Sequence, residues 1–268
     1  MIKIYKGQEV SDGAGVKLNR VIATQELDHA DPFFLLDEFR SDNKEDYIAG
    51  FPMHPHRGIE TITYMKQGKF THRDSKGNEG LLKAGEVQWM TAGIGILHEE
   101  MPAMEAGQLW GYQLWINLPA KLKMIEPQYR HIKEGDMPLI KGDGYEVKLI
   151  SGVFNGTEGP VKASFSVDYM DIDIEEATVK LQTRGTNIIY VHTGEVEISD
   201  NGQKYKVAKG NMAVAEDIKD IEVYGKKAGV LYLSSDPINE PVYRYGPFVM
   251  NTSEEIIQAI DDFNQGKY

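Results

Sequence analysis

Two stretches of the sequence, about 125 residues apart, carry the same pattern of apolar residues and glycines. Residues 62–68 read ITYMKQG and residues 188–194 read IIYVHTG. The pairs that correspond are Tyr64 with Tyr190, Gly68 with Gly194, Gly77 with Gly202 and Gly85 with Gly210. A period of this length is too long for a solenoid and fits a duplicated domain. The repeat therefore predicts two related domains in one chain.

Short runs of β-branched and aromatic residues fill both halves of the chain. They lie at residues 16–22, 61–65, 111–116, 145–150, 187–191 and 229–233. Runs of this length, separated by turn-forming residues, are typical of strands. The 27 glycines and 11 prolines in 268 residues supply the tight turns. We therefore expect an all-β fold, a sandwich or barrel in each half.

Helical periodicity is clear only near the end, at residues 254–263. Thr252 or Ser253 can cap this helix, and Gly266 follows its last turn. We expect residues 1–125 to form the first barrel, and residues 126–268 to form the second barrel with the C-terminal helix. Whether the two ends of the chain pack on the opposite lobe is left open by the sequence.

Charge and composition exclude several classes of function. The 41 acidic residues outnumber the 29 basic ones and give a net charge of −12, which disfavours direct binding to nucleic acid. The sequence has no run of 18 apolar residues and no apolar signal segment, so we expect a cytoplasmic protein that does not enter membranes. The chain contains no cysteine, which excludes disulfides and thiolate ligands.

Three histidines form the candidate site. His54 and His56 are two residues apart, and His98 is followed by Glu100 at the same spacing. On extended strands each pair projects to one face, so four ligands converge if the strands meet. Imidazole and carboxylate ligands suit iron, manganese, nickel, cobalt, copper or zinc. Glu60 has the same parity as His56, so both Glu60 and Glu100 remain open as the carboxylate ligand.

The second half of the chain lacks these ligands. The repeat offset places Lys180, Gln182 and Thr186 at the positions of His54, His56 and Glu60, and Val223 and Gly225 near those of His98 and Glu100. The sequence therefore predicts a metal in the N-terminal barrel alone. His192 lies in the predicted hairpin turn, and we interpret it as a solvated histidine.

The order of glycines, His-x-His, glutamate and a later histidine resembles the metal motif of cupin barrels. Five segments together are similar to the pirin family: residues 53–61 (MHPHRGIET), 72–77 (HRDSKG), 87–100 (VQWMTAGIGILHEE), 113–119 (QLWINLP) and 246–252 (GPFVMNT). This resemblance implies a bicupin of two jelly-roll barrels with one mononuclear iron(II) site in the first. The implied ligands are His54, His56, His98 and Glu100. Glu60 would then lie beside the ligands or pair with Arg57. Glu99, where relatives often have serine, should point away from the metal.

The resemblance also implies an activity like that of quercetin 2,3-dioxygenase, which opens the central ring of a flavonol with O2. Glu100 would act as both ligand and catalytic base on a small aromatic or enolic substrate. We expect an apolar pocket among Phe51, Met53, Trp89, Met90 and Trp115. His72 and residues 74–77 are interpreted as part of an ordinary hairpin.

Some pirins resemble transcriptional cofactors that dock on other proteins. The alternative function is therefore a non-enzymatic, iron-dependent regulator or redox sensor. The acidic charge suits a protein partner better than DNA.

Overall fold

The computed structural model describes residues 1–161, 164–200 and 202–268, and its contacts divide the chain into two compact units. The unit that we call the first barrel comprises Glu9–Ala23, Phe33–Glu134 and Ile238–Tyr268. The second barrel comprises Met1–Gln8, Thr24–Pro32 and Gly135–Pro237. These units differ from the expected division at residue 125 at both ends of the chain, whose packing the sequence had left open. The N-terminal strand lies in the second barrel and the C-terminal helix in the first.

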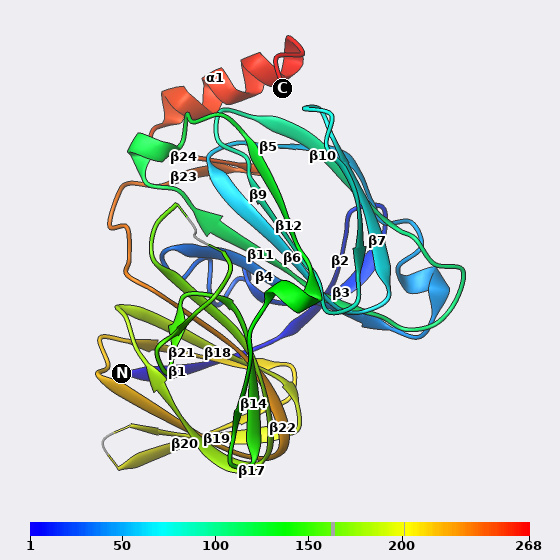
Figure 1. Cartoon of the computed structure of the whole chain (residues 1–268). Helices are drawn as coiled ribbons and strands as arrows, with labels where there is room; N and C mark the ends of the chain where they lie inside the picture. The colour runs from blue at the N-terminus through cyan, green and yellow to red at the C-terminus, as the bar shows by residue number, and fades with distance from the viewer. Residues whose placement is uncertain (162–163, 201) are drawn as a thin grey trace. The chain divides into compact units, whose positions relative to one another are not determined.

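The first barrel consists of two antiparallel sheets (Figure 1). The seven-stranded sheet has the order β12-β9-β6-β11-β4-β3-β2, and the four-stranded sheet the order β5-β10-β7-β8. Their bounds are β2 (Gln8–Asp12), β3 (Val16–Ile22), β4 (Phe33–Ser41), β5 (Phe51–His56), β6 (Ile59–Gln67), β7 (Lys69–Asp74), β8 (Glu79–Lys83), β9 (Val87–Thr91), β10 (Ile96–Pro102), β11 (Leu109–Asn117) and β12 (Gln128–Ile132).

Apolar residues from both sheets meet between them. Phe39 and Met65 of the seven-stranded sheet pack with Phe70 and Leu82 of the four-stranded sheet. Strand residues alternate between the two faces of a sheet, so one face of each is committed to this core. The strands β5 and β10 pair side by side, and their register sets the candidate site.

The second barrel is built around one nine-stranded antiparallel sheet. Its main path is β1-β21-β18-β22-β17-β14-β13, and β19 joins it to β20. The bounds are β1 (Ile2–Lys6), β13 (Leu139–Gly142), β14 (Tyr145–Ser151), β17 (Val167–Gln182), β18 (Thr186–Thr193), β19 (Glu195–Asp200), β20 (Gln203–Ala208), β21 (Asn211–Glu216) and β22 (Asp220–Ser235), with a separate pair β15 (Val153–Phe154) and β16 (Thr157–Glu158).

The predicted repeat is visible in the two folds. The hairpin β19–β20 corresponds to β7–β8, and Gly194 and Gly68 precede these hairpins with φ values of 68° and 92°. Both glycines adopt a left-handed conformation that side chains disfavour. The all-β prediction is confirmed, and each of the six predicted strand runs lies within an observed strand.

The long helix, α1 (Ser253–Asn264), belongs to the first barrel. Thr252 is its N-cap and forms a capping box with Glu255, as the sequence allowed. Ile256 and Ala259 pack against Phe248 of the hairpin β23 (Tyr243–Tyr245) and β24 (Phe248–Met250). Three short 3-10 helices complete the elements: η1 (Lys44–Asp46), η2 (Ala120–Leu122) and η3 (Glu134–Asp136). Within the described ranges, no helix is long and apolar enough to span a membrane.

Candidate metal centre

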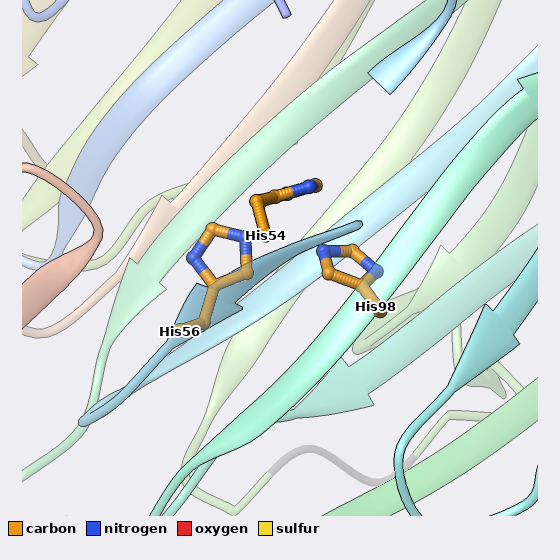
Figure 2. A group of neighbouring side chains, drawn as sticks. All are labelled: His54, His56 and His98. Carbon is orange, nitrogen blue, oxygen red and sulfur yellow. The ribbon is translucent and has the colours of Figure 1, made fainter. Parts of the chain in front are cut away.

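The strands β5 and β10 bring the three predicted histidines together. His54 pairs with His98 across the two strands, and His56 lies opposite Ile96. One ring nitrogen from each histidine lies within 4.8 Å of the others. Figure 2 shows the three rings gathered around one point. The structure therefore brings together the three histidines of the four side chains whose convergence strand parity predicted.

The ring nitrogens of these histidines are suited to bind a metal. His54 donates from Nδ1 to the carbonyl of Pro52 at 2.8 Å, which leaves Nε2 as the nitrogen with a lone pair. The His56 ring bonds to the backbone of Pro247, and its buried Nδ1 has no hydrogen-bond partner in the described chain. The same holds for both nitrogens of His98. Buried polar atoms are nearly always paired, so these orphaned nitrogens fit a metal ion.

Burial also favours the protonation state that a metal requires. Removal from water lowers the pKa of His54, and lowers the pKa of His56 and His98 well below the usual value. The rings are therefore neutral at physiological pH. Neutral imidazole is the form that ligates metals.

Glu100 follows His98 by two residues on β10. Among the described residues, its carboxylate is not one of the groups whose ligand atoms all lie within 4.8 Å of one another. Its carboxylate accepts hydrogen bonds from Thr63 and from Gln88, the latter at 3.2 Å. Burial raises the pKa of Glu100 to about 7, although both hydrogen bonds act in the opposite direction. The side chain lines the same cavity as His54 and His56, so it can exchange a proton with a molecule bound there.

Glu60 lies on the face of the seven-stranded sheet that is opposite to the face contacted by Glu100. It accepts hydrogen bonds from Trp89 Nε1 at 3.0 Å and Thr91 Oγ1 at 2.9 Å. Thr63 is three residues farther along β6 and bonds Glu100, so Glu60 and Glu100 contact opposite faces of the seven-stranded sheet. Of the two carboxylates left open by the sequence, only Glu100 faces the histidines.

The parity argument for Glu60 failed because His56 and Glu60 are not on one strand. β5 ends at His56, and the chain turns at Gly58 with φ of +79° before β6 begins. A Cβ on Gly58 would lie 2.1 Å from the carbonyl oxygen of Val249, so only glycine fits this turn. The expected alternative, a pair between Glu60 and Arg57, does not form either. Arg57 instead donates to Asp262 of α1.

A cavity of about 520 Å³ opens beside His54 and His56. Phe51 and Trp115 line it as expected, and the Trp115 ring lies 4.9 Å from that of His56. Trp89 and Met90 are buried in the core instead, and Met53 is an exposed side chain outside the lining. This size is typical of a site for a small organic molecule.

The sequence analysis missed four charged side chains in the cavity wall, which are Asp12, Arg20, Asp37 and Arg244. Arg20 of β3 donates from Nε and Nη2 to the two oxygens of Asp37 on β4, at 2.9 and 2.7 Å. Both residues line the cavity. The available signal was Asp37 itself, a carboxylate within the apolar run 33–39. Such a residue is rarely buried without a partner.

The predicted hairpin at residues 74–77 is present. Asp74 accepts a hydrogen bond from the backbone of Lys76, and Gly77 has φ of +86°. His72, however, is buried, and its ring centroid lies 5.5 Å from that of His98. His72, on the strand that leads into this hairpin, therefore lies next to the candidate metal centre.

In the second barrel, two positions that correspond to the histidine pair differ from it as predicted, whereas the interpretation of His192 is contradicted. Lys180 and Gln182, which stand in place of the histidine pair, are exposed. His192 is completely buried, so its interpretation as a solvated histidine is wrong. It forms a group with Asp171 and Asp173, but both ring nitrogens already have partners, Thr193 Oγ1 and Asp171 Oδ1, each at 3.0 Å.

Comparison with known proteins agrees with this geometry. Residues 15–116 match the Pirin family model, and residues 169–268 match the model of the Pirin C-terminal cupin domain. A pirin-like protein of Caulobacter vibrioides is 42% identical over 279 residues, which span all of this chain and 98% of that protein.

Two solved structures share the fold. A quercetin 2,3-dioxygenase from Acinetobacter baumannii is 32% identical with a TM-score of 0.89, over 99% of this chain and 96% of that one. The bacterial pirin YhhW from Escherichia coli, in complex with nickel(II), is 22% identical with a TM-score of 0.71 over 88% and 100% of the two chains, which supports the fold alone. With two family models covering most of its length and a close relative along all of it, the chain belongs to the pirin family.

Proposed function

We propose that the protein is a metal-dependent dioxygenase that opens the ring of quercetin-type flavonols or related enolic aromatics with O2. The observation that supports this most directly is the cavity of about 520 Å³ lined by His54, His56 and the buried carboxylate of Glu100, with His98 grouped with the two lining histidines. A site that only fixed the structure would need no such opening, since structural metal sites are closed by protein ligands. The 32% identical relative that is named a quercetin 2,3-dioxygenase supports the same reaction class.

His54, His56 and His98 would hold one divalent transition metal through neutral nitrogens, with Glu100 as the proposed fourth ligand. Iron(II) is the metal we propose, and nickel, manganese, cobalt, copper and zinc are compatible with the same donors. When bound, the metal supplies Lewis acidity toward the hydroxyl oxygens of a substrate.

Glu100 is the proposed catalytic base. Its Oε1 accepts the hydrogen bonds from both Thr63 and Gln88, so the carboxylate is held in one orientation. Oε2 is then the oxygen that can take the hydroxyl proton of the substrate. Loss of that proton gives an electron-rich anion that reacts with O2. A pKa of about 7 matches this role, because a base works best with a pKa near the ambient pH.

The cavity walls would orient a flat aromatic molecule. Trp115, Phe51 and Leu35 supply apolar surface to the cavity lining. Trp115 lies edge-on to the His56 ring, with an interplanar angle of 82°. A planar substrate packed on these side chains would have its hydroxyl oxygens directed toward the histidines. Water would be displaced from the same space.

The test is an aerobic assay of metal-free protein reconstituted with each divalent ion. Loss of the flavonol absorption band of quercetin, matched by O2 consumption, is the expected result. His98→Ala should abolish metal binding and turnover. Glu100→Gln should retain the fold and lose turnover at least about 100-fold, as expected when a general base is removed.

The matched control is His131→Ala, which removes a histidine of the same barrel that pairs with Glu86 away from the cavity. This variant should keep full activity. A protein that binds metal but oxidises no flavonol with any of the ions would contradict the dioxygenase, and would favour the non-enzymatic regulator instead.

A further inference from the structure

A second pair of buried polar side chains lies behind the histidines that face the cavity. β7 pairs with β10 so that Asp74 is opposite His98 and His72 is opposite Glu100. Directly opposed residues share one face of a sheet, so all four side chains point to the same side. The side chains of His72 and Asp74 are 1% and 0% exposed. This pair is therefore in position to act on the metal ligands.

Asp74 determines which nitrogen of His72 carries the proton. Its Oδ1 accepts from the backbone N–H groups of Lys76 and Asn78, and its Oδ2 accepts from the Asn78 amide, each at 2.9 Å. A carboxylate surrounded by donors is held in its ionised form, which can only accept. His72 Nε2 lies 3.2 Å from Oδ2 and must be the protonated nitrogen. Nδ1 of neutral His72 is then an acceptor.

That acceptor is directed into the protein. Nδ1 of His72 is buried and has no hydrogen-bond partner among the described residues. Tyr129 stacks on the ring with 4.6 Å between centroids and an interplanar angle of 20°, which restricts how the ring can rotate. Tyr129 is itself accommodated because Gly80 has no side chain: a Cβ there would lie 2.4 Å from the Tyr129 hydroxyl. The orientation of His72 is thus fixed by packing as well as by Asp74.

His98 has the complementary requirement. A neutral imidazole that ligates a metal through one nitrogen carries its proton on the other, and that N–H needs an acceptor. The centroids of His98 and His72 are 5.5 Å apart. Two imidazoles joined by one N–H···N bond have centroids roughly 5 Å apart, so a small adjustment brings the rings into bonding distance.

We propose that His72 is a positioning residue that accepts a hydrogen bond from metal-bound His98, so that Asp74, His72 and His98 form one chain of hydrogen bonds to the metal. This inference rests on the metal site proposed above. Groups that orient a ligating histidine raise its basicity and fix its tautomer. A carboxylate usually does so directly, and here an intervening imidazole transmits the effect.

The first experiment measures the tautomer in the intact protein. The imidazole nitrogens are observed by ¹⁵N NMR in wild-type protein loaded with zinc, which is diamagnetic. We expect His72 to be protonated at Nε2 and bare at Nδ1, and the non-ligating nitrogen of His98 to carry a hydrogen-bonded proton. A proton on Nδ1 of His72 would overturn the proposal, because two N–H groups cannot bond each other.

The second experiment measures zinc affinity by competition with a chromophoric chelator. His72→Phe keeps the ring shape and removes the acceptor, and Asp74→Asn keeps Oδ1 for the turn but places an amide donor near Nε2. Both variants should bind zinc about 10- to 100-fold more weakly. His131→Phe, in the same barrel, should bind like the wild type.

Several outcomes are distinguishable. If wild-type protein binds no metal, the proposed function fails and the inference with it. If wild type binds zinc and His72→Phe, folded by circular dichroism, binds equally well, the inference alone is overturned. If His72→Phe does not fold, the NMR result on the wild-type protein still decides.

Discussion

At the scale of single residues, the cavity wall contains an ion pair whose two members differ in burial: Asp37 is buried, and Arg20 is partly exposed. Asp37 is 3% exposed and accepts two hydrogen bonds from Arg20, which also donates to Asp12 at 2.6 Å. Burial raises the pKa of Asp37 to about 6, although Arg20 acts to lower it. The cost of removing the carboxylate from water therefore exceeds what Arg20 returns.

This imbalance predicts how stability depends on pH. The pKa of Asp37 is higher in the folded than in the unfolded protein, so its stabilising contribution is complete below about pH 4 and is lost as the pH rises through about 6. Relative to Asp37→Asn, the wild type should lose about 2 kcal/mol of unfolding free energy between pH 4 and pH 7. Urea unfolding of metal-free protein measures this. A difference between the two proteins that stays constant with pH would contradict the assignment.

Tryptophan fluorescence isolates the relevant barrel in that measurement. The chain has three tryptophans, at positions 89, 110 and 115. All three lie in the first barrel. Their signal therefore reports the unfolding of the barrel that contains Asp37.

The sequence predicted those site residues whose placement depends only on strand alternation. His54 and His56 share a face because they lie on one unbroken strand. The sequence could not decide whether Glu60 faces the histidines, because the turn at Gly58 separates Glu60 from that strand. His192 was misplaced because burial in a duplicated sheet depends on what packs over it, which spacing does not encode. Arg20 and Asp37 meet through β3–β4 pairing; the run 33–39 indicates that Asp37 needs a partner, but no local pattern identifies Arg20 as that partner.

At the scale of elements, helix α1 is tied to the strand that carries the histidine pair. Arg57 directly follows His56 and is 3% exposed. Its two terminal nitrogens donate to one oxygen of Asp262, each at 3.0 Å, and its Nε donates to the carbonyl of Ile94. The guanidinium also lies 4.7 Å from the centre of the Tyr268 ring. The sequence predicted the helix and its cap from local signals, but this partner is more than 200 positions away.

Asp262→Ala should therefore be strongly destabilising. The substitution leaves the Arg57 guanidinium buried without its carboxylate, which costs about 3 kcal/mol or more. The neighbouring Asp261→Ala is the matched control, because Asp261 is exposed on the same helix and should change stability by less than about 0.5 kcal/mol. Urea unfolding followed by tryptophan fluorescence measures both variants. Equal losses would show that helix propensity, and not the ion pair, accounts for the effect.

At the scale of the whole molecule, the chain alternates between the two barrels. Each barrel takes three separate segments, so neither is a continuous piece of sequence. A fragment of residues 126–268 would lack β1, which pairs with β21, and a fragment of residues 1–125 would lack β12 and α1. The repeat revealed the duplication because the corresponding strands and glycines occur in both halves of the sequence. It could not show the exchanged ends, since those segments have no counterpart in the other half.

The duplication also predicts how many metal ions one chain binds. In the first barrel, buried nitrogens of His56 and His98 have no hydrogen-bond partner among the residues that the structure describes, whereas in the second barrel both nitrogens of His192 are bonded. A metal at His192 would have to displace existing hydrogen bonds, so we expect one ion per chain. Elemental analysis after zinc loading and desalting should give about one equivalent for the wild type and for His192→Asn. His54→Ala should give almost none. Two equivalents in the wild type that fall to one in His192→Asn would assign a second site to the group formed by Asp171, Asp173 and His192.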